Sequence, residues 1–172
     1  ITITSRLLGH KSNLTFRGIT SVYLSYNTPE ILPKGIHWLY YGSEEIHFNR
    51  VTEPKKLTPF IAPEDKTYLT AEITYSKGDQ IDIMNSEDLI DEISEQIEKV
   101  GLIKKSELHN SSVNKEPFVY PLYYKGYQQE LTKTRAAISK YQQLYSLGTG
   151  GDYNYADSQI LFHKAFDTVS II

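Results

Sequence analysis

The protein has 172 residues, of which 40% are apolar and 23% charged, and its formal net charge at pH 7 is -3. This length and composition suit a globular chain with a hydrophobic core of ordinary size. The weak negative charge excludes the basic field that nucleic acids and anionic membranes attract, so neither is expected as a partner. The absence of cysteine excludes disulfides, cysteine-containing zinc sites and thiol nucleophiles.

No part of the sequence is typical of a secreted or membrane protein. No apolar run reaches the roughly 20 residues of a membrane-spanning helix, and no signal peptide opens the chain. The five histidines lack the spacing of a zinc site, so no metal is expected. Together with the lack of cysteine, these features predict a cytoplasmic protein.

The first half of the chain predicts β-strands, because β-branched and aromatic residues are concentrated there between Pro, Gly and Asn residues. No element is predicted for residues 1–14. The expected strands cover residues 16–26, 36–41, 46–51 and 68–75. The last of these alternates apolar and polar residues, so its odd-numbered side chains should face a core.

The second half is richer in helical periodicity. Ser86 is the expected N-cap of a helix that stops at Gly101. The pattern then predicts a polar connector over 104–117, a strand over 118–124, a helix over 127–144, a short strand over 144–147 and a last helix from about Asn154 to Val169. Strands followed by helices favour an α+β fold, with a mainly antiparallel sheet and flanking helices.

The sharpest local pattern is the glycine-rich stretch Gly148-Thr149-Gly150-Gly151 before the last helix. Glycines allow positive φ and close approach of a ligand, and a helix N-terminus presents unpaired N–H groups to an anion. Asn154 and Asp157 are candidates to cap this helix. The residues alone fit either a phosphate- or flavin-contacting segment or a capped turn without a ligand. They match neither a P-loop nor the G-x-G-x-x-G fingerprint.

Other candidate residues also allow two interpretations. The tyrosines at positions 120, 123, 124 and 127 could stack against a flavin, sugar or base, or pack in the core. Arg50 could bind a substrate anion or form a surface ion pair. Trp38 is expected in the core, and the carboxylates of Glu53 and Glu72 on the solvated surface.

The segment from Leu147 to Asp157 resembles the C-terminal flavin motif of the superfamily of UDP-galactopyranose mutase, protoporphyrinogen oxidase and flavin amine oxidase. Residues 120–123 and 126–127 resemble a tyrosine-proline segment of its mutase-like members, and residues 48–54 resemble a substrate-domain strand and loop. The resemblance covers residues 16–172 and is specific over about the last fifty. Thr149 stands where the family usually has a phosphate-holding arginine, and no G-x-G-x-x-G is present.

This resemblance implies two domains: a substrate-binding α+β domain over residues 1–145, and a segment over 146–172 that returns to an FAD-binding domain. Because the fingerprint is absent and the chain begins at Ile1, we expect a C-terminal fragment. Its partner would be the missing N-terminal FAD-binding domain of the same protein. FAD would be the cofactor of that full-length protein, and the fragment alone would neither retain it nor catalyse a reaction.

The resemblance also implies roles for individual residues. Those expected to contact the cofactor are Gly148, Thr149, Gly150, Gly151, Tyr155, Ala156, Asp157 and Ser158. Those expected to contact a small-molecule substrate are Arg50, Tyr123 and Tyr153. No catalytic residue is assigned.

The implied function is that of an FAD-dependent oxidoreductase of the amine-oxidase-like group. Two alternatives remain open: a UDP-galactopyranose-mutase-like flavoenzyme without net oxidation, and a non-catalytic, tyrosine-rich module that binds carbohydrate or protein. A self-sufficient module should have a closed core, whereas a fragment should expose a large apolar surface.

Overall fold

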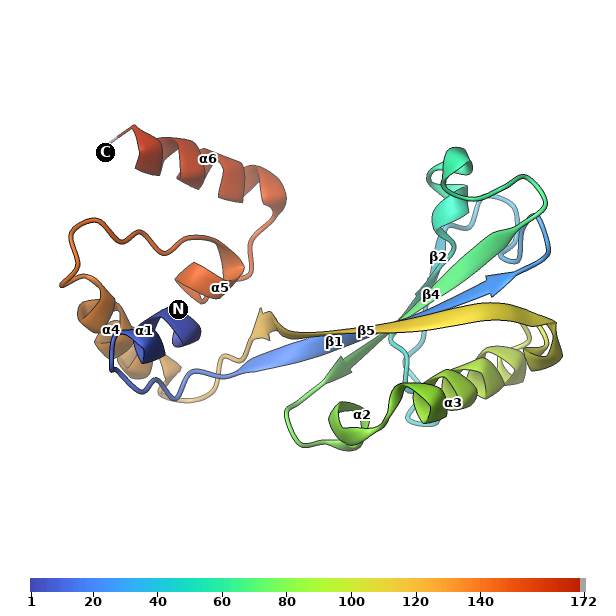
Figure 1. Ribbon diagram of the computed structural model, residues 1–172, viewed down its shortest axis with the longest axis horizontal. Coiled ribbons are helices and arrows are strands. Elements are labelled where there is room, and N and C mark those ends of the chain that lie inside the picture. The colour runs from blue at the N-terminus through green and yellow to red at the C-terminus, as the bar shows by residue number, and fades with distance from the viewer. Residues whose placement is uncertain (171–172) are drawn as a thin grey trace. The chain divides into compact units, whose positions relative to one another are not determined.

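The computed structural model describes residues 1–170 of the chain, and its elements are labelled in Figure 1. The chain divides into two compact units. Gly18–Glu116 form the sheet unit, whereas Ile1–Arg17 and the chain from Pro117 onward form the helical unit. This division reflects contacts within the chain. The boundary expected at residues 145 and 146 concerns a domain outside it and stays a prediction.

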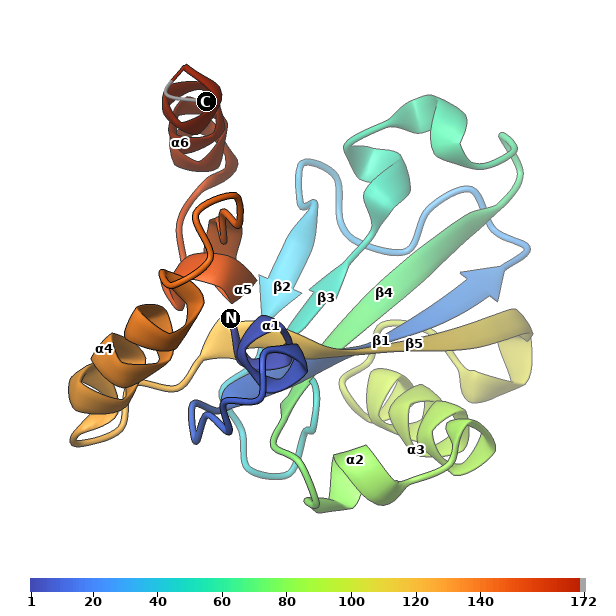
Figure 2. The same ribbon diagram turned by 60° about the vertical axis from the view of Figure 1, so that its left-hand side comes forward.

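Five strands form one sheet in the order β2-β3-β4-β1-β5, and the strand labels follow this order across Figure 2. Their bounds are β1 Phe16–Tyr26, β2 Trp38–Tyr40, β3 Arg50–Thr52, β4 Thr67–Tyr75 and β5 Leu108–Pro121. The pairs β1–β4, β2–β3 and β3–β4 are antiparallel, and β5 runs opposite to β1 (Figure 1). The predicted α+β fold with a mainly antiparallel sheet is confirmed. Strands predicted over 36–41 and 46–51 are shorter than expected.

The sequence prediction differed most from the structure at strand β5. Residues 104–117 were expected to be a polar connector, but Leu108–Pro121 form one strand at the edge of the sheet. Most of its side chains are partly or fully exposed, so its sequence lacks an apolar alternation. Charged residues and prolines are typical of edge strands, because they discourage pairing with another chain.

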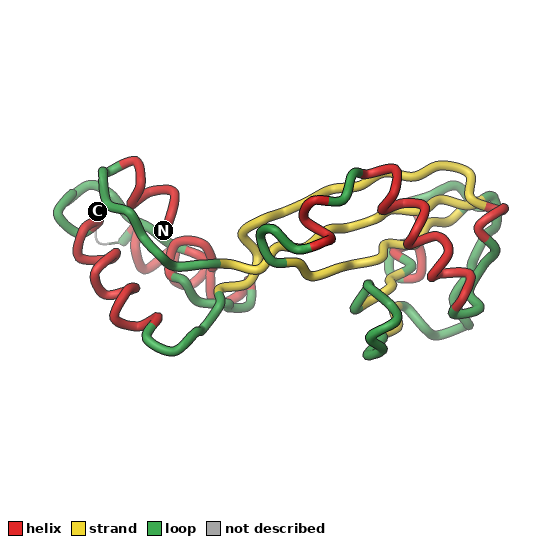
Figure 3. Tube along the Cα trace, turned by 90° about the horizontal axis from the view of Figure 1, so that it is seen from below, coloured by secondary structure: helices red, strands yellow, loops and turns green. Residues whose placement is uncertain are grey.

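Helices α2 (Gln80–Ile83) and α3 (Ser86–Lys99) cover one face of the sheet, as Figure 3 shows from below. The core lies between them. Its fully buried members include Val22, Leu24, Leu69, Ala71, Leu89, Ile93 and Ile97. The odd-numbered residues of β4 are buried there, as predicted. The N-cap of α3 is Asn85 rather than Ser86, because the Asn85 side chain accepts a hydrogen bond of 2.9 Å from Asp88 N.

The helical unit contains α1 (Thr2–Leu7), α4 (Tyr127–Ile138), α5 (Gly148–Asp152) and α6 (Ser158–Val169). Several predicted boundaries here were wrong. The helix expected over 127–144 ends at Ile138, residues 144–147 form no strand, and the glycine-rich stretch begins a short helix instead of a loop. The last helix begins at Ser158 and not near Asn154. Glycines are poor helix formers, so the sequence did not favour α5.

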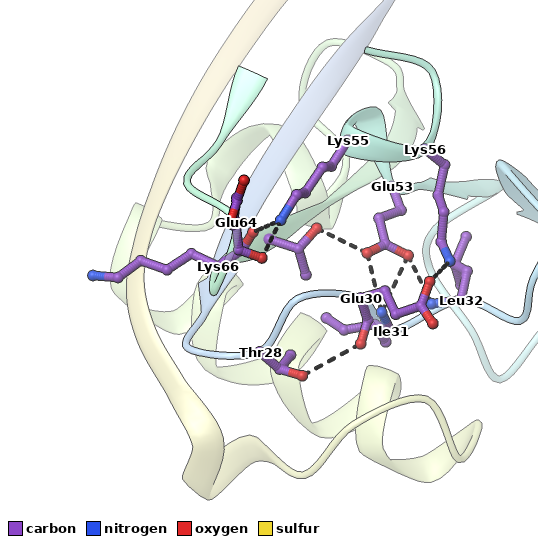
Figure 4. A network of polar contacts seen from close by, with 10 residues as sticks. Thr28, Glu30, Ile31, Leu32, Glu53, Lys55, Lys56, Glu64 and Lys66 are labelled. Carbon is purple, nitrogen blue, oxygen red and sulfur yellow. Dashed lines mark hydrogen bonds and ion pairs between the residues drawn. The ribbon is translucent and has the colours of Figure 1, made fainter. Parts of the chain in front are cut away.

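A buried carboxylate holds the chain between β1 and β2 in place (Figure 4). Glu53, just after β3, is fully buried. It accepts hydrogen bonds from Ile31 N (3.0 Å), Leu32 N (2.7 Å) and Thr67 Oγ1 (2.8 Å). The expectation of a solvated surface role for Glu53 was therefore wrong. Once buried, these donors can no longer hydrogen-bond to water, so they depend on the Glu53 carboxylate. The carboxylate thereby fixes this loop against β4.

A second clamp lies on the neighbouring loop that carries the short 3₁₀ turns η1 (Pro54–Lys56) and η2 (Pro59–Ile61). The ammonium group of Lys55 donates to three backbone carbonyls, those of Pro63, Glu64 and Lys66, at 2.7 to 2.8 Å (Figure 4). Together with the prolines, these bonds fix the shape of the loop. The loop nevertheless presents Phe60 to solvent, 97% exposed.

Replacing Glu53 with alanine tests the first clamp. Glu53→Ala leaves two backbone N–H groups and the Thr67 hydroxyl without their acceptor, so the free energy of unfolding should fall by about 3 kcal/mol. Urea unfolding followed by circular dichroism measures this change. The control, Glu64→Ala, removes an exposed carboxylate from the same region and should change stability by less than about 0.5 kcal/mol. A similar small effect of both substitutions would contradict the assigned role of Glu53.

Candidate functional site

The face of the sheet opposite α2 and α3 is the first candidate site, and we call it the open face. Along β1 every second residue is buried and the residues between them are only partly so. The partly exposed set belongs to the open face. The open face includes Tyr23, Trp38, Tyr40, Arg50, Thr52, Tyr68 and Glu72, together with Thr70, which is itself buried.

Strand register aligns these side chains in rows. One row runs from Tyr40 on β2 through Arg50 on β3 to Glu72 on β4. The next row is formed by Trp38, Thr52, Thr70 and Tyr23. Because directly opposite residues of antiparallel strands point to the same face, each row forms a continuous strip of side chains. Each row thus places polar groups beside aromatic ones.

An ion pair lies in the first row. Arg50 Nε donates to Glu72 Oε2 at 3.0 Å, and Arg50 Nη2 donates to Glu72 Oε1 at 2.7 Å. The arginine Cζ lies 5.9 Å from the centroid of the Tyr40 ring, a cation–π arrangement. Hydrogen bonding to Glu72 raises the pKa of Arg50 further above its ordinary value. Glu72 is therefore paired on this face, contrary to the expectation that it is a solvated surface carboxylate.

Two shallow depressions lie on the open face beside this pair. One, of about 370 Å³, is lined by Tyr23, Trp38, Arg50, Thr52, Pro54, Leu57, Tyr68, Thr70 and Glu72. The second, of about 380 Å³, shares Tyr23 and Tyr68 with it and adds Ser25 and residues 110–112. Both volumes are within the range of small-molecule sites. Trp38 is 45% exposed here, so its predicted core position was wrong.

The second candidate site lies in the helical unit, where the predicted tyrosines gather. Tyr153 is 1% exposed. Its hydroxyl lies 2.7 Å from the carbonyl oxygen of Thr15 and 2.6 Å from that of Leu122. Burial raises its pKa, so the hydroxyl stays protonated and can donate to either carbonyl. Its ring packs edge-on against Phe16 with the centroids 5.1 Å apart. These are contacts of a core residue, and its predicted contact with substrate stays a prediction.

Two neighbouring tyrosines are more accessible. Tyr123 is half exposed, and its hydroxyl accepts a hydrogen bond of 3.2 Å from Tyr155 N. The Tyr155 ring is 57% exposed and lies 5.1 Å, between centroids, from that of Tyr120. Tyr123 and Tyr155 therefore offer aromatic surface to a ligand at this site.

The glycine-rich stretch meets the geometric demands that favour glycine. Gly148 has a φ of +81°, and a Cβ at Gly151 would lie 2.8 Å from the carbonyl carbon of Ser146. Asp152 then fixes α5 in place, since its carbonyl accepts a bond from Arg135 and its carboxylate pairs with Lys164 at 3.0 Å. The close packing at Gly151 is thus explained without a ligand.

Helix α6 begins at Ser158, with Asp157 in the N-cap position. The Asp157 side chain makes no capping hydrogen bond, and its carbonyl accepts the first bonds from Ile160 N and Leu161 N. Asn154 lies outside the helix, so its predicted capping role was wrong. The N–H groups of Ser158 and Gln159 precede the first helical donors and lie at the positive end of the helix dipole.

The predicted cofactor-contacting residues, Gly148–Gly151, Tyr155 and Ala156–Ser158, all belong to the helical unit, together with Tyr123 and Tyr153. Arg50 belongs to the sheet unit. Tyr40 and Glu72 are neighbours of Arg50 that were not predicted from the sequence. The alternation of β4 already placed Glu72 on the face away from the core, but the register that brings it to Arg50 was not evident from the sequence.

Within residues 1–170, histidine, aspartate and glutamate side chains form no group of three or more that could hold a metal ion. In the same residues, every helix is too short or too polar to cross a membrane. The expected cytoplasmic location stays a prediction.

No protein-family profile matches the sequence, and no curated protein matches it. The fold, however, is found in solved structures. The crystal structure of reduced UDP-galactopyranose mutase superposes with a TM-score of 0.68 at 20% sequence identity, over 81% of this chain and 29% of that one. A protein assigned as a protoporphyrinogen oxidase from Exiguobacterium sp. 255-15 superposes with a TM-score of 0.64 at 18% identity, over 80% of this chain and 31% of that one.

The likeness establishes a shared fold with part of these two proteins. The chain spans less than a third of the length of either. Both structures come from kinds of protein that the sequence-based resemblance also names.

A pair of conservative substitutions separates a core role of Tyr153 from a ligand-contacting one. Tyr153→Phe removes a buried hydroxyl that serves two carbonyls, so the free energy of unfolding should fall by about 1 to 2 kcal/mol. Tyr155→Phe removes an exposed hydroxyl and should change stability by less than about 0.5 kcal/mol. Thermal and urea unfolding provide the measurement. If Tyr153→Phe left stability unchanged, its hydroxyl would not hold the segments around Thr15 and Leu122 together.

Proposed function

We propose that this chain is the substrate-binding portion of an FAD-dependent oxidoreductase of the amine-oxidase-like group. The open face receives a small-molecule substrate, and residues 148–158 contact the flavin. FAD supplies the redox chemistry when bound. The chain orients the substrate through aromatic and polar side chains and places a helix N-terminus beside the cofactor.

The observation that carries this proposal is the open face. A sheet packed by helices on one face and lined on the other by Trp38, Tyr23, Tyr68 and a paired Arg50 offers a ligand both apolar surface and hydrogen-bonding groups. Exposed aromatic and paired charged groups in a depression are typical of small-molecule sites. The fold shared with a mutase and an assigned oxidase supports placing a flavoenzyme substrate there.

The residues of the helical unit fit part of an FAD molecule. Within residues 1–170, no other atom lies within 4 Å of the place where a Cβ would stand at Gly148 or Gly150, so a ligand can approach the backbone closely. The N-terminus of α6 suits an electron-rich ring oxygen or a phosphate. The adenosine part of FAD would have to be bound by residues outside this sequence, because the sequence lacks the dinucleotide fingerprint.

The exposed apolar surface of helix α6 favours an FAD-binding domain of the same protein as the partner of this chain. Three of its apolar residues at helical spacing, Phe162, Phe166 and Val169, are each between 66% and 72% exposed. Such a stripe is typical of a docking surface and unfavourable in water. We infer that this stripe packs against the FAD-binding domain.

The visible absorption spectrum of the protein encoded by the complete reading frame tests the proposal. Purified without added cofactor, it should show flavin bands that bleach with dithionite. A colourless protein that takes up no added FAD would refute the flavoenzyme proposal and favour a tyrosine-rich binding module. Flavin bands without net oxidation of any amine would favour the mutase-like alternative.

A charge placed at the start of α6 tests the flavin-contacting segment in the same protein. Ser158→Glu should stabilise the helix, because acidic residues suit its first turn. It should nevertheless weaken FAD binding about tenfold through repulsion of the electron-rich cofactor. The control Gln143→Glu adds the same charge in an exposed loop and should leave FAD affinity unchanged. Equal affinities of the two variants, measured by FAD fluorescence quenching, would argue against contact at Ser158.

A further inference from the structure

The charges that line the two depressions of the open face cancel. Among residues 1–170, Arg50 and Glu72 are the only charged side chains that line the depression around Trp38, and the adjoining depression has no charged lining residue. The two charges are joined by two parallel hydrogen bonds of 3.0 and 2.7 Å. The open face therefore presents donors and acceptors side by side without a net field.

This balance discriminates among ligands. An anion would have to compete with Glu72 for the Arg50 guanidinium while lying next to the carboxylate, and a cation would meet the converse penalty. A neutral group that both donates and accepts hydrogen bonds meets neither electrostatic penalty. Arginine has five N–H donors, of which two serve Glu72, and the carboxylate keeps free lone pairs.

The remaining lining residues favour a ligand that contains a ring. Trp38, Tyr23 and Tyr68 provide flat surfaces for C–H groups, and their polar edges, with the hydroxyls of Thr52 and Thr70, can hydrogen-bond around them. A ring that carries adjacent hydroxyls has both features: apolar C–H faces, and neighbouring O–H groups that can accept from Arg50 and donate to Glu72.

We propose that the open face selects an uncharged, hydroxylated ring, a monosaccharide unit without phosphate or carboxylate, and that Glu72 sets this charge selectivity. This inference rests on the proposed function for the location of the substrate. Glu72 acts by neutralising Arg50, so removing its charge converts the face into one that favours anions.

The 172-residue chain contains a single tryptophan, Trp38, so its fluorescence reports directly on the open face. The chain is titrated with the methyl β-glycosides of glucose and galactose, and with the methyl β-glycosides of the matching uronic acids. Each uronide differs from its neutral partner only by a carboxylate in place of the hydroxymethyl group. The neutral glycosides of at least one sugar should change the Trp38 emission and bind about tenfold more tightly than the uronide. Failure of every neutral glycoside to change the emission, or a preference for uronides, would overturn the proposal.

Glu72→Gln keeps the size and one hydrogen-bond acceptor of the side chain but removes its charge. In this variant the preference should reverse in favour of the uronide, which requires the affinity ratio to change by more than about tenfold. The matched control Glu87→Gln removes an exposed charge from the first turn of α3 and should leave the ratio as in the unmodified chain. An unchanged ratio in Glu72→Gln, with the circular dichroism of the folded chain retained, would overturn the assigned role of Glu72. The comparison of ligands on the unmodified chain stands even if that variant does not fold.

The result is separable from the flavin experiment. Flavin bands in the complete protein without saccharide selectivity would leave the proposed function intact and refute this inference. A colourless protein whose chain still selects neutral glycosides would refute the flavoenzyme and retain the inference for a binding module.

Discussion

The two-residue alternation of side chains along β1 and β4, combined with the packing of α2 and α3 on one face, determines the character of the sheet unit. Residues such as Val22, Leu24 and Leu69 bury their side chains against α3, and each neighbour along the strand must then point the opposite way. A slip of one residue in the register would exchange the core with the open face. The same packing that stabilises the sheet therefore also sorts its polar and aromatic groups onto one surface.

The open face depends on structure beyond the sheet itself. Glu53 holds the loop that leads into β2, the strand that carries Trp38 and Tyr40. Burying a carboxylate is unfavourable unless it is fully hydrogen-bonded, and here backbone N–H groups and a threonine hydroxyl provide those bonds. A three-residue edge strand is weakly held by its own ladder, so this anchor contributes to the position of the aromatic side chains.

The fold and the candidate site differed in how far the sequence could predict them. Strands β1 and β4 and helix α3 were predictable, because each buries one face in the core and therefore has a regular spacing of apolar residues in its sequence. Strand β5 was not, because an edge strand with partly exposed faces has no reason to alternate. The pairing of Arg50 with Glu72 depends on the register of two strands and joins residues 22 positions apart in the sequence, which no local pattern encodes. Similarly, Glu53 has the sequence context of a surface residue, and only the fold surrounds it with donors.

The clamp formed by Lys55 has an energetic consequence for any ligand of the open face. Pro54 and Leu57, which line the depression around Trp38, belong to the loop whose three carbonyls this ammonium group binds. That loop is ordered by internal bonds and proline residues before a ligand arrives. Association therefore need not include the entropy cost of freezing this wall, and more of the contact energy is available as affinity.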